Sequence, residues 1–538
     1  MIDALIRKVR QLRDDPVLAT WLLGRALGRW PGEPTFVPHR PPYLEGLLPL
    51  GLETPAVSFP QIQSGDPSGT LDLDLPGERI RLEPGQTARL FERTYGDLET
   101  ELAVHRFAWL NDATDPAWVH AVWRAWRERF GTRPDGWPWH PYTAAERAVA
   151  LLAFARRHGL PGGEEVLAAH GPAIAARLEY FGEHHTSNHL FNNGRGLFLL
   201  GLGLGLPRCT EVGARIVVEE AKRIFRPSGV LREGSSHYHV LLARRLQEVA
   251  DAATGRPEAA FLGEAARKAW SVVPHLRLPG GIALVGDISP DIRPDRLFRN
   301  LERAEPGDST ALAADGWLRA DFGPWAGLWH AAAEGWSPMP GHGHQDLGSF
   351  ELHFGTEPVF VDPGRGAYGE TGEAARYRSA SVHNTLLVDG WDPYPPNRPY
   401  YDATFRRRVG GLPPELRREG DTVVLRHSGF KRFNGMGAST RRWAFHDKAF
   451  FLSDTLEGRG RREISRRLVT PLAVEGQGTT LLLKGKEMTL RLTCGEAAWK
   501  TEPVTRWTAY GVGEPATLLI AETTAPLPWS GKIILEVL

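Results

Sequence analysis

The chain has 538 residues, with 64 basic and 64 acidic side chains and a formal net charge of zero. This length excludes a single small module, and a composition with 42% hydrophobic and 24% charged residues excludes a largely disordered chain. Zero net charge excludes the general electrostatic attraction of a protein that coats nucleic acid, so we expect no nucleic-acid partner and any polyanion must bind in a local cleft.

The first 95 residues divide into a helix and a segment rich in Pro and Gly. Leu, Ile and Val at helical spacing predict an amphipathic helix within Met1–Trp30. The apolar run Val17–Leu23 is short and lacks a small-residue cleavage site, so it is no clear signal peptide. We therefore expect a cytoplasmic protein, or a periplasmic or secreted one if an export signal was removed. No stretch approaches the roughly 20 apolar residues of a transmembrane segment.

From about residue 97 to 315 the apolar residues recur with helical period. Asp115 and Gly131 delimit one helix, and Thr143 with Glu146 reads as a capping box for the next. We interpret the stripe Trp118, Val122, Trp126 and Phe130 as a helix core rather than a sugar-binding platform. The predicted helices cover residues 115–131, 143–159, 163–180, 189–204, 211–226, 237–253 and 258–273. Their short separations favour antiparallel helical hairpins.

After about residue 320 the pattern changes to short apolar runs separated by Gly, Asp and Asn turns. Such runs predict an antiparallel sandwich or barrel. The predicted strands cover residues 349–361, 385–388, 422–427, 443–456, 479–483 and 488–493. We therefore divide the chain into an irregular region over 1–95 that packs on the helical part, a helical region over 96–320 and a strand region over 321–538.

Histidine and tyrosine gather in three short stretches, Glu183–His189, Gly234–His239 and Gly341–Asp346. Two imidazoles in a His-x-His pair lie on the same side of an extended chain, and with a carboxylate they form a common first shell for zinc. Asp362 and His383 follow as available ligands. The two cysteines, Cys209 and Cys494, lie far apart and form neither a disulfide framework nor a thiolate metal site.

The residue types in these stretches suit β-elimination from a uronic acid. The C5 proton lies next to a carboxylate and becomes removable only when that carboxylate is neutralised, so that preorganised donors stabilise the developing enolate. Asn and His can neutralise the charge, while Tyr and His can remove the C5 proton and protonate the leaving O4. The sequence contains no Walker loop, no Rossmann glycine fingerprint and no Gly-x-Ser-x-Gly elbow.

Five segments together resemble the heparinase II/III family of polysaccharide lyases. They are Ser187–Leu190, Glu233–His239, His342–Phe350, Val361–Gly364 and His383–Gly390, and they occur in the family's order. The resemblance implies an incomplete (α/α) toroid followed by an antiparallel β-sandwich. It also implies a lyase that acts on an acidic polysaccharide or oligosaccharide.

The resemblance assigns roles to particular residues. Asn188 would neutralise the uronate carboxylate with His189 beside it, and Tyr238 would be the general acid and, for some substrates, the base. His342 would be the partner base or a carboxylate ligand. The expected structural zinc ligands are His344, Asp362 and His383. The expected substrate contacts, with His184 as a further competitor for neutralisation, are His185, His239, Arg232 and Arg378.

Two other functions stay open from the sequence. A glycoside hydrolase on a similar helical toroid needs two carboxylates at a suitable separation. The candidates are Glu183 and Glu233, and the sequence gives no evidence that they act as a pair. A non-catalytic carbohydrate-binding protein of envelope polysaccharide assembly needs no acid or base. A homodimer is compatible with the sequence. The identity of the acidic polysaccharide and endo or exo action are beyond the sequence.

Overall fold

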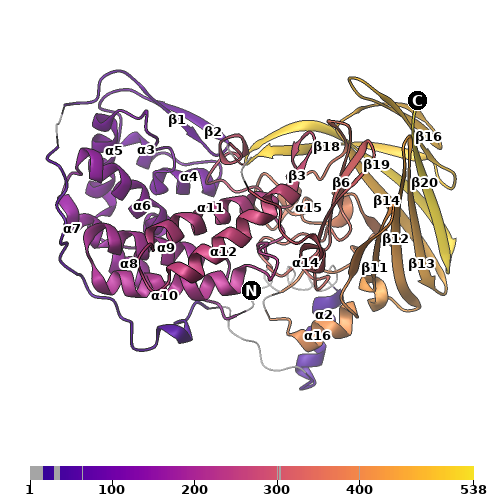
Figure 1. The fold of residues 1–538 in the computed structure, drawn as a ribbon, viewed down its shortest axis with the longest axis horizontal. Coiled ribbons are helices and arrows are strands. Elements are labelled where there is room, and N and C mark those ends of the chain that lie inside the picture. Colours follow the sequence, from indigo (N-terminus) through magenta and orange to yellow (C-terminus); the bar gives the residue numbers. More distant parts are fainter. Residues whose placement is uncertain are drawn as a thin grey trace, which may run out of the picture.

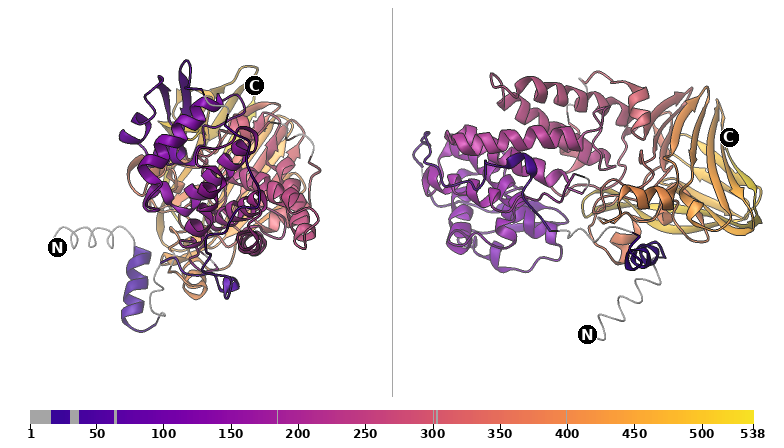
Figure 2. Two further views of the ribbon diagram at one scale, coloured as in Figure 1. Left: turned by 90° about the vertical axis from the view of Figure 1, so that its left-hand side faces the viewer. Right: turned by 90° about the horizontal axis from the view of Figure 1, so that it is seen from below.

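The computed structural model describes residues 16–29, 37–62, 65–183, 185–299, 301, 304–398 and 400–538. Helices fill one half of the molecule and strands the other, in chain order (Figure 1). The view from below shows the same division (Figure 2, right). None of the helices in these ranges is long and apolar enough to cross a membrane.

The helical half follows the predicted helices closely. Asp115 caps its helix by accepting a hydrogen bond from the Ala117 amide. The predicted helix over 163–180 is instead two short helices. The capping box at Thr143 is wrong, because the helix begins at Pro141 and Thr143 is buried inside it. The helices are α4 (Leu98–Arg106), α5 (Pro116–Phe130), α6 (Pro141–His158), α7 (Gly163–Ala168), α8 (His170–Ala175), α9 (Asn188–Leu204), α10 (Pro207–Ile224), α11 (Ser236–Ala252) and α12 (Ala259–Val272).

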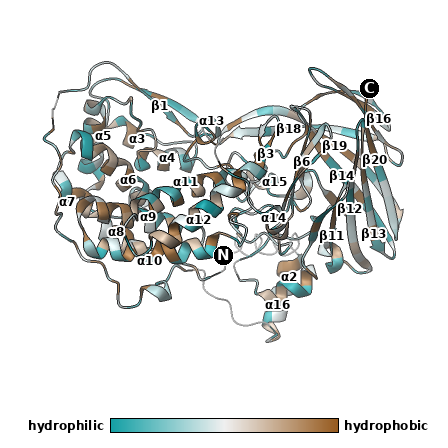
Figure 3. Ribbon diagram, viewed as in Figure 1, coloured by the Kyte–Doolittle hydropathy of each residue, from teal (hydrophilic) through white to brown (hydrophobic). Residues whose placement is uncertain are grey.

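The core of the helical half contains the aromatic stripe of α5. Trp118, Val122 and Trp126 are buried, which confirms the prediction of a core face. Hydrophobic stretches also run along α8 and α9 (Figure 3). Helices α9 and α10 pack closely at Gly213, where a Cβ atom would lie 2.3 Å from the Phe198 nitrogen. A side chain there would force the two helices apart.

The first 95 residues differ from the expected irregular cover. They contain a hairpin of β1 (Leu71–Leu75) and β2 (Glu78–Leu82), and the short helix α3 (Arg89–Glu92). Helix α2 (Pro16–Ala26) packs on the strand-rich half rather than on the helices, next to α16 (Ala403–Gly410) (Figure 1). The Trp21 ring lies 4.5 Å from that of Tyr400. The amphipathic helix predicted within Met1–Trp30 thus exists over α2, while residues 1–15 and 30 lie outside the described ranges.

The strand half contains three larger antiparallel sheets. One has four strands in the order β5-β6-β7-β8, and another has four in the order β18-β19-β14-β9. The third has eight in the order β10-β11-β12-β13-β20-β17-β16-β15. The strands of the first sheet are β5 (Trp317–Phe322), β6 (Trp325–His330), β7 (Phe350–Phe354) and β8 (Glu357–Phe360). The others are β9 (Leu386–Val388), β10 (Glu415–Glu419), β11 (Thr422–His427), β12 (Met436–His446), β13 (Ala449–Gly458), β14 (Arg461–Thr470), β15 (Ala473–Gln477), β16 (Thr480–Lys484), β17 (Thr489–Cys494), β18 (Trp499–Ala509), β19 (Val512–Pro526) and β20 (Trp529–Val537).

All six predicted strand segments contain strands, but two of them are hairpins. The segment 349–361 folds into β7 and β8, and the segment 443–456 spans the turn between β12 and β13. The sheets share one core, in which the Trp329 ring of the first sheet lies 6.1 Å from the Trp443 ring of the eight-stranded sheet. Leu519 of the remaining four-stranded sheet belongs to the same cluster. This is the layered packing of a sandwich.

Two further pieces lie between the halves in the sequence. Strands β3 (Arg277–Leu278) and β4 (Gly281–Ile282) form a small hairpin. The chain then continues through residues 283–293 to α13 (Pro294–Leu297). Asp287 forms an isolated parallel bridge with Arg365 of the strand half. This segment therefore joins the helical half to the strand half at the place where the predicted site residues meet.

Candidate active site

A cavity of 210 Å³ lies where the two halves meet. Its walls come from α4, α6, α9 and α11 on one side and from the loops around residues 341 and 368 on the other. Three predicted catalytic residues, His189, Tyr238 and His342, line it together, although they are far apart in the sequence. The fourth, Asn188, lies behind this wall.

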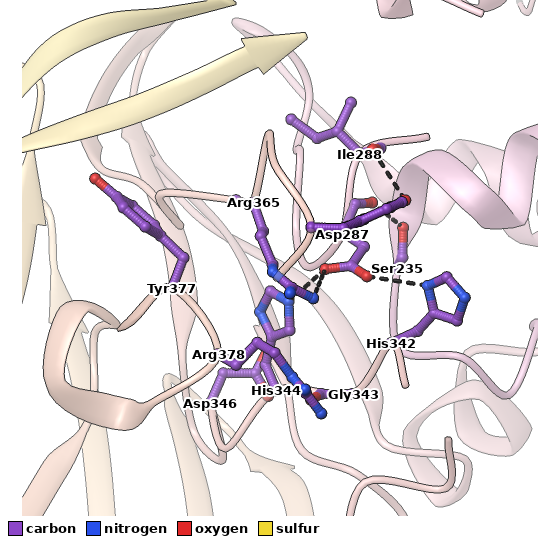
Figure 4. A network of polar contacts seen from close by, with 12 residues as sticks. Ser235, Asp287, Ile288, His342, Gly343, His344, Asp346, Arg365, Tyr377 and Arg378 are labelled. Atoms are coloured by element: carbon purple, nitrogen blue, oxygen red, sulfur yellow. Dashed lines mark hydrogen bonds and ion pairs between the residues drawn. The ribbon is translucent and has the colours of Figure 1, made fainter. Parts of the chain in front are cut away.

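His342 is held by a buried carboxylate that the sequence did not reveal. Asp287 Oδ2 lies 3.0 Å from His342 Nδ1, and Asp287 Oδ1 lies 2.8 Å from His344 Nε2 and 3.4 Å from Arg365 Nη1 (Figure 4). Burial alone would raise the pKa of Asp287, but the two histidines and Arg365 hold it well below its usual value. A carboxylate at Nδ1 fixes the tautomer in which Nδ1 carries the proton and Nε2 accepts one. His342 is therefore oriented as a base.

Tyr238 lies on the other side of His342, with ring centroids 5.2 Å apart. Its hydroxyl forms a 2.6 Å hydrogen bond with the hydroxyl of Tyr368, which in turn donates to the Ile288 carbonyl at 3.3 Å. Burial, and next the carboxylate of Asp291, raise the pKa of Tyr238 well above its usual value. Tyr238 thus keeps its proton and is suited to act as an acid rather than as a base.

Asn188 and His189 begin helix α9, and each is paired with a carboxylate. The Asn188 side chain is fully buried and donates to Glu233 Oε2 at 2.7 Å, while its backbone amide donates to Glu233 Oε1 at 2.8 Å. The side-chain nitrogen of Asn188 therefore binds inside the protein, while its Oδ1 is buried with no partner in the part of the chain that the structure describes. His189 faces the cavity, and its Nδ1 lies 2.8 Å from Glu179 Oε1. Burial lowers the pKa of His189, but Glu179 and Glu233 outweigh this and raise it above its usual value.

A second buried carboxylate, Asp291, organises the opposite wall. Its oxygens pair with Arg106 at 2.8 Å and with Arg245 at 2.7 Å, and one of them accepts a hydrogen bond from the Tyr142 hydroxyl. The ring of Tyr142 lies 4.5 Å from that of His189. These contacts fix the aromatic surface against which His189 rests, and they leave Asp291 fully paired.

The residues expected to contact substrate have other partners. His239 is fully buried, its Nδ1 accepts from the Leu231 amide and its Nε2 lies 2.9 Å from the Ala269 carbonyl, so it is a core histidine. Arg232 donates to the Glu183 and Thr186 carbonyls.

Arg378 fixes the loop that carries His342 by donating to the carbonyls of Pro340 and Gly343. His185 lies on the turn before α9, outside the lining of the 210 Å³ cavity. His184 lies outside the described residues. None of the four expected substrate contacts therefore faces the cavity where His342 and Tyr238 meet.

The expected metal ligands are close together, with one difference. Ligand atoms of His344, Asp346 and His383 lie within 4.8 Å of one another. Asp362 takes a different place: its Oδ2 lies 2.9 Å from His383 Nδ1 and accepts a 2.7 Å bond from the Ser349 hydroxyl. The structure thus groups Asp346, rather than the expected Asp362, with His344 and His383, while Asp362 and the Tyr377 carbonyl each contact one ring nitrogen of His383.

Several residues of the candidate site cannot be predicted from the sequence, because most of them belong to no recognisable motif. Asp287 and Asp291 lie in an irregular segment without periodicity, and their partners are 46 to 185 residues away. Tyr368 belongs to none of the motifs named from the sequence, and its pairing with Tyr238 depends on the meeting of the two halves. Asp346 was visible, because it ends the Gly-His-Gly-His-Gln-Asp loop beside His344.

The geometry can be compared with known proteins. Residues 304–521 match the model of a family described as heparinase II/III-like, C-terminal. No curated protein matches the chain. Among solved structures, a heparinase III is 16% identical, with 82% of this chain and 76% of that chain covered and a TM-score of 0.59.

Two further structures agree with this result. A heparinase III gene product is 16% identical, with 82% and 79% covered and a TM-score of 0.57. A mutant of the heparan sulfate lyase HepC from Pedobacter heparinus is 15% identical, with 85% and 80% covered and a TM-score of 0.54. The expected fold, an (α/α) toroid followed by an antiparallel β-sandwich, is confirmed. The chain carries a heparinase II/III-like C-terminal domain on the fold of the heparinase III structures.

Proposed function

We propose that the protein is a polysaccharide lyase that cleaves a uronic-acid-containing polysaccharide by β-elimination. The observation that carries this proposal is the arrangement of His342 and Tyr238. An imidazole oriented by Asp287, whose Nε2 has no partner among the described residues, faces a tyrosine that keeps its proton, in a cavity between the two halves. A base and an acid of this kind are what the removal of a C5 proton and the departure of O4 require.

The steps follow from these positions. The imidazolium of His189, whose pKa Glu179 raises, neutralises the uronate carboxylate and so stabilises the enolate that forms when the C5 proton leaves. Nε2 of His342 takes that proton, and Asp287 stabilises the resulting imidazolium. Tyr238 gives its proton to O4 as the C4–O4 bond breaks and the C4–C5 double bond forms. The Tyr368 hydroxyl can then turn its proton from the Ile288 carbonyl to the tyrosinate, which remains until a proton from solvent replaces the lost one.

This scheme changes the role that the sequence suggested for Asn188. Its amide donates to Glu233, so its effect on substrate is indirect: it holds Glu233 in place, and Glu233 contributes to the raised pKa of His189. His189 is then the principal neutralising group.

The cavity disfavours a glycoside hydrolase. Retaining and inverting enzymes both need two available carboxyl groups. The three carboxylates that line the cavity are all paired. Asp291 pairs with two arginines, Glu99 with Arg106 at 3.0 Å and Glu370 with Arg378 at 2.9 Å.

We further propose that His344, Asp346 and His383 hold a zinc ion. His383 Nδ1 lies 2.9 Å from Asp362 and its Nε2 lies 2.9 Å from the Tyr377 carbonyl, so one of these two contacts must give way when zinc binds. The donor set of two imidazoles and a carboxylate suits zinc. His344 Nδ1 is buried and has no hydrogen-bond partner within the part of the chain that the structure describes, as a vacant ligand atom would be. Bound there, zinc would fix the loop that carries His342 and supply no acid or base.

The test is a screen of uronate polysaccharides, including heparin-like chains, alginate and hyaluronan, for products that gain ultraviolet absorbance from the new double bond. We expect at least one polymer to be cleaved, with Tyr238→Phe and His342→Ala each lowering kcat about 10²–10⁴-fold. A protein that binds such a polymer without any gain in absorbance would instead be the carbohydrate-binding protein. Full activity in both variants would refute the assigned roles.

A further inference from the structure

An exposed tryptophan, Trp137, lies on a short turn outside the 210 Å³ cavity, and the proposed mechanism does not use it. Trp137 is 47% exposed, whereas Trp139 in the same turn is 5% exposed and packs into the core. The turn (Trp137–Trp139) follows Gly136, whose φ of 69° is a backbone conformation that favours glycine. Gly136 and Pro138 therefore give this turn a shape that places one indole inside the protein and the other on its surface.

Arginine side chains hold the turn rigidly. Arg147 Nη1 donates to the Pro138 carbonyl at 2.6 Å, and Arg177 Nη2 donates to the Trp139 carbonyl at 2.9 Å. Arg147 is itself fully buried, with its guanidinium 4.0 Å from the Trp126 ring centroid. An isolated exposed hydrophobic residue needs no explanation. An indole held on so firmly fixed a support, however, is preorganised to bind, because little conformational entropy is lost when a ligand stacks on it.

The turn forms one wall of the cavity, of 890 Å³, that contains His140, Glu179 and Arg40. This volume lies in the range of about 300–1,000 Å³ typical of ligand pockets. Arg40 is exposed and makes no ion pair with any residue that the structure describes. Arg177 lies 3.7 Å from Asp135, a weak and partly exposed pair. An aromatic face and an available guanidinium suit a sugar ring that bears a carboxylate or sulfate.

This larger cavity adjoins the 210 Å³ cavity through a row of rings. The Trp137 ring lies 5.5 Å from that of His140, which lies 6.4 Å from His189, which lies 6.5 Å from His342. Glu179 belongs to the wall of the larger cavity and binds His189 at the same time. A polysaccharide with one uronate at His189 and His342 could therefore continue past His140 to Trp137.

We propose that the cavity at Trp137 is a distal subsite, in which the indole stacks on an acidic sugar ring of the substrate chain and Arg40 binds its carboxylate or sulfate. This inference rests on the proposed function, because it takes the uronate at His189 as the start of the path. It adds that the enzyme binds chains long enough to reach Trp137 more tightly than short ones.

The test compares long and short ligands on the full chain. Calorimetry measures the binding of disaccharides and octasaccharides of heparan sulfate, alginate and hyaluronan to wild type and to Trp137→Ala, Trp137→Phe and Arg40→Ala. For at least one octasaccharide we expect Trp137→Ala to weaken binding about tenfold, Trp137→Phe to restore most of it, and disaccharide binding to stay within twofold. Trp391→Ala is the matched control, because Trp391 is 38% exposed on the strand half.

Each outcome decides the inference, and its failure is distinguishable from that of the proposed function. If the variants change octasaccharide and disaccharide binding by the same factor, or if none of the octasaccharides binds, the subsite is refuted. Should Trp137→Ala not fold, the exposed Arg40→Ala gives the same comparison. The lyase proposal is tested separately by the new ultraviolet absorbance, so a chain that cleaves polymer without length preference refutes only the subsite. Length-dependent binding without cleavage refutes only the lyase.

Discussion

Asp287 orients the proposed base, and Asp287→Asn removes its charge while nearly preserving its shape. The carboxylate is fully buried and lies 3.0 Å from His342 Nδ1. A hydrogen bond to a charged group contributes about 1.5–3 kcal/mol. Because His342 becomes a cation when it takes the C5 proton, this stabilisation is greatest in the transition state. At 1.4 kcal/mol for each factor of ten, we expect kcat/KM to fall roughly 10- to 150-fold, mainly through kcat.

The assay is the initial rate of absorbance gain on a cleaved polysaccharide, measured as a double-mutant cycle with His342→Ala. If Asp287 acts through His342, the double variant is no slower than His342→Ala alone. Asp454→Asn is the control, since Asp454 is equally buried and lies 2.7 Å from Arg441 in the strand half. We expect the control to lower the unfolding temperature while the rate per folded molecule is unchanged.

Two results would refute this reasoning. One is a folded Asp287→Asn variant with kcat/KM within twofold of wild type. The other is an Asp287→Asn effect that is equally large with and without the imidazole at position 342, since Asp287 would then act through His344 or through the packing of the loop.

Three other predictions concern separate parts of the molecule. Glu179→Gln removes the charge that raises the pKa of His189, so the imidazolium persists only to a lower pH. In a plot of 1/KM against pH, the alkaline limb should therefore move to lower pH. An unmoved limb would contradict the role of His189. His344→Ala should lower the zinc content measured by mass spectrometry and the unfolding temperature of zinc-loaded protein, and unchanged zinc would count against the cluster. Trp329→Ala, in the centre of the strand core, should lower the free energy of unfolding by about 3–5 kcal/mol in denaturant titrations, and a loss below 1 kcal/mol would show that the core repacks.

Much of the fold was predictable because it depends on local patterns. Helical period and capping residues placed α5 and α9 to α12 within a few residues, and alternation with turn residues placed β11. The errors arose where local signals compete. Thr143 resembles a cap, but Pro141 suits the first turn and starts the helix earlier. The apolar pattern of segment 443–456 predicts one strand, but Asp447 and Lys448 form a turn inside it.

The candidate site was predictable only for residues within recognisable motifs. His189, Tyr238 and His342 belong to such motifs, and the structure brings them together. Asp287 has no motif, and its role arises only because residues 283–293 pass between the halves. The burial of Asn188 against Glu233 is likewise a tertiary fact, since nothing in either local sequence requires their pairing.

Three arginines around the cleft each donate to two loop carbonyls. The shape of the cleft therefore depends on their guanidinium groups and not only on their positive charge. Arg378 joins Pro340 to Gly343, Arg232 joins Glu183 to Thr186, and Arg177 joins Pro134 to Trp139. A planar guanidinium reaches two carbonyls at fixed angles, whereas an ammonium donates from a single flexible point. The chain has nine lysines among its 64 basic residues. Exchanging these arginines for lysine would keep every formal charge and still release the loops around the cleft.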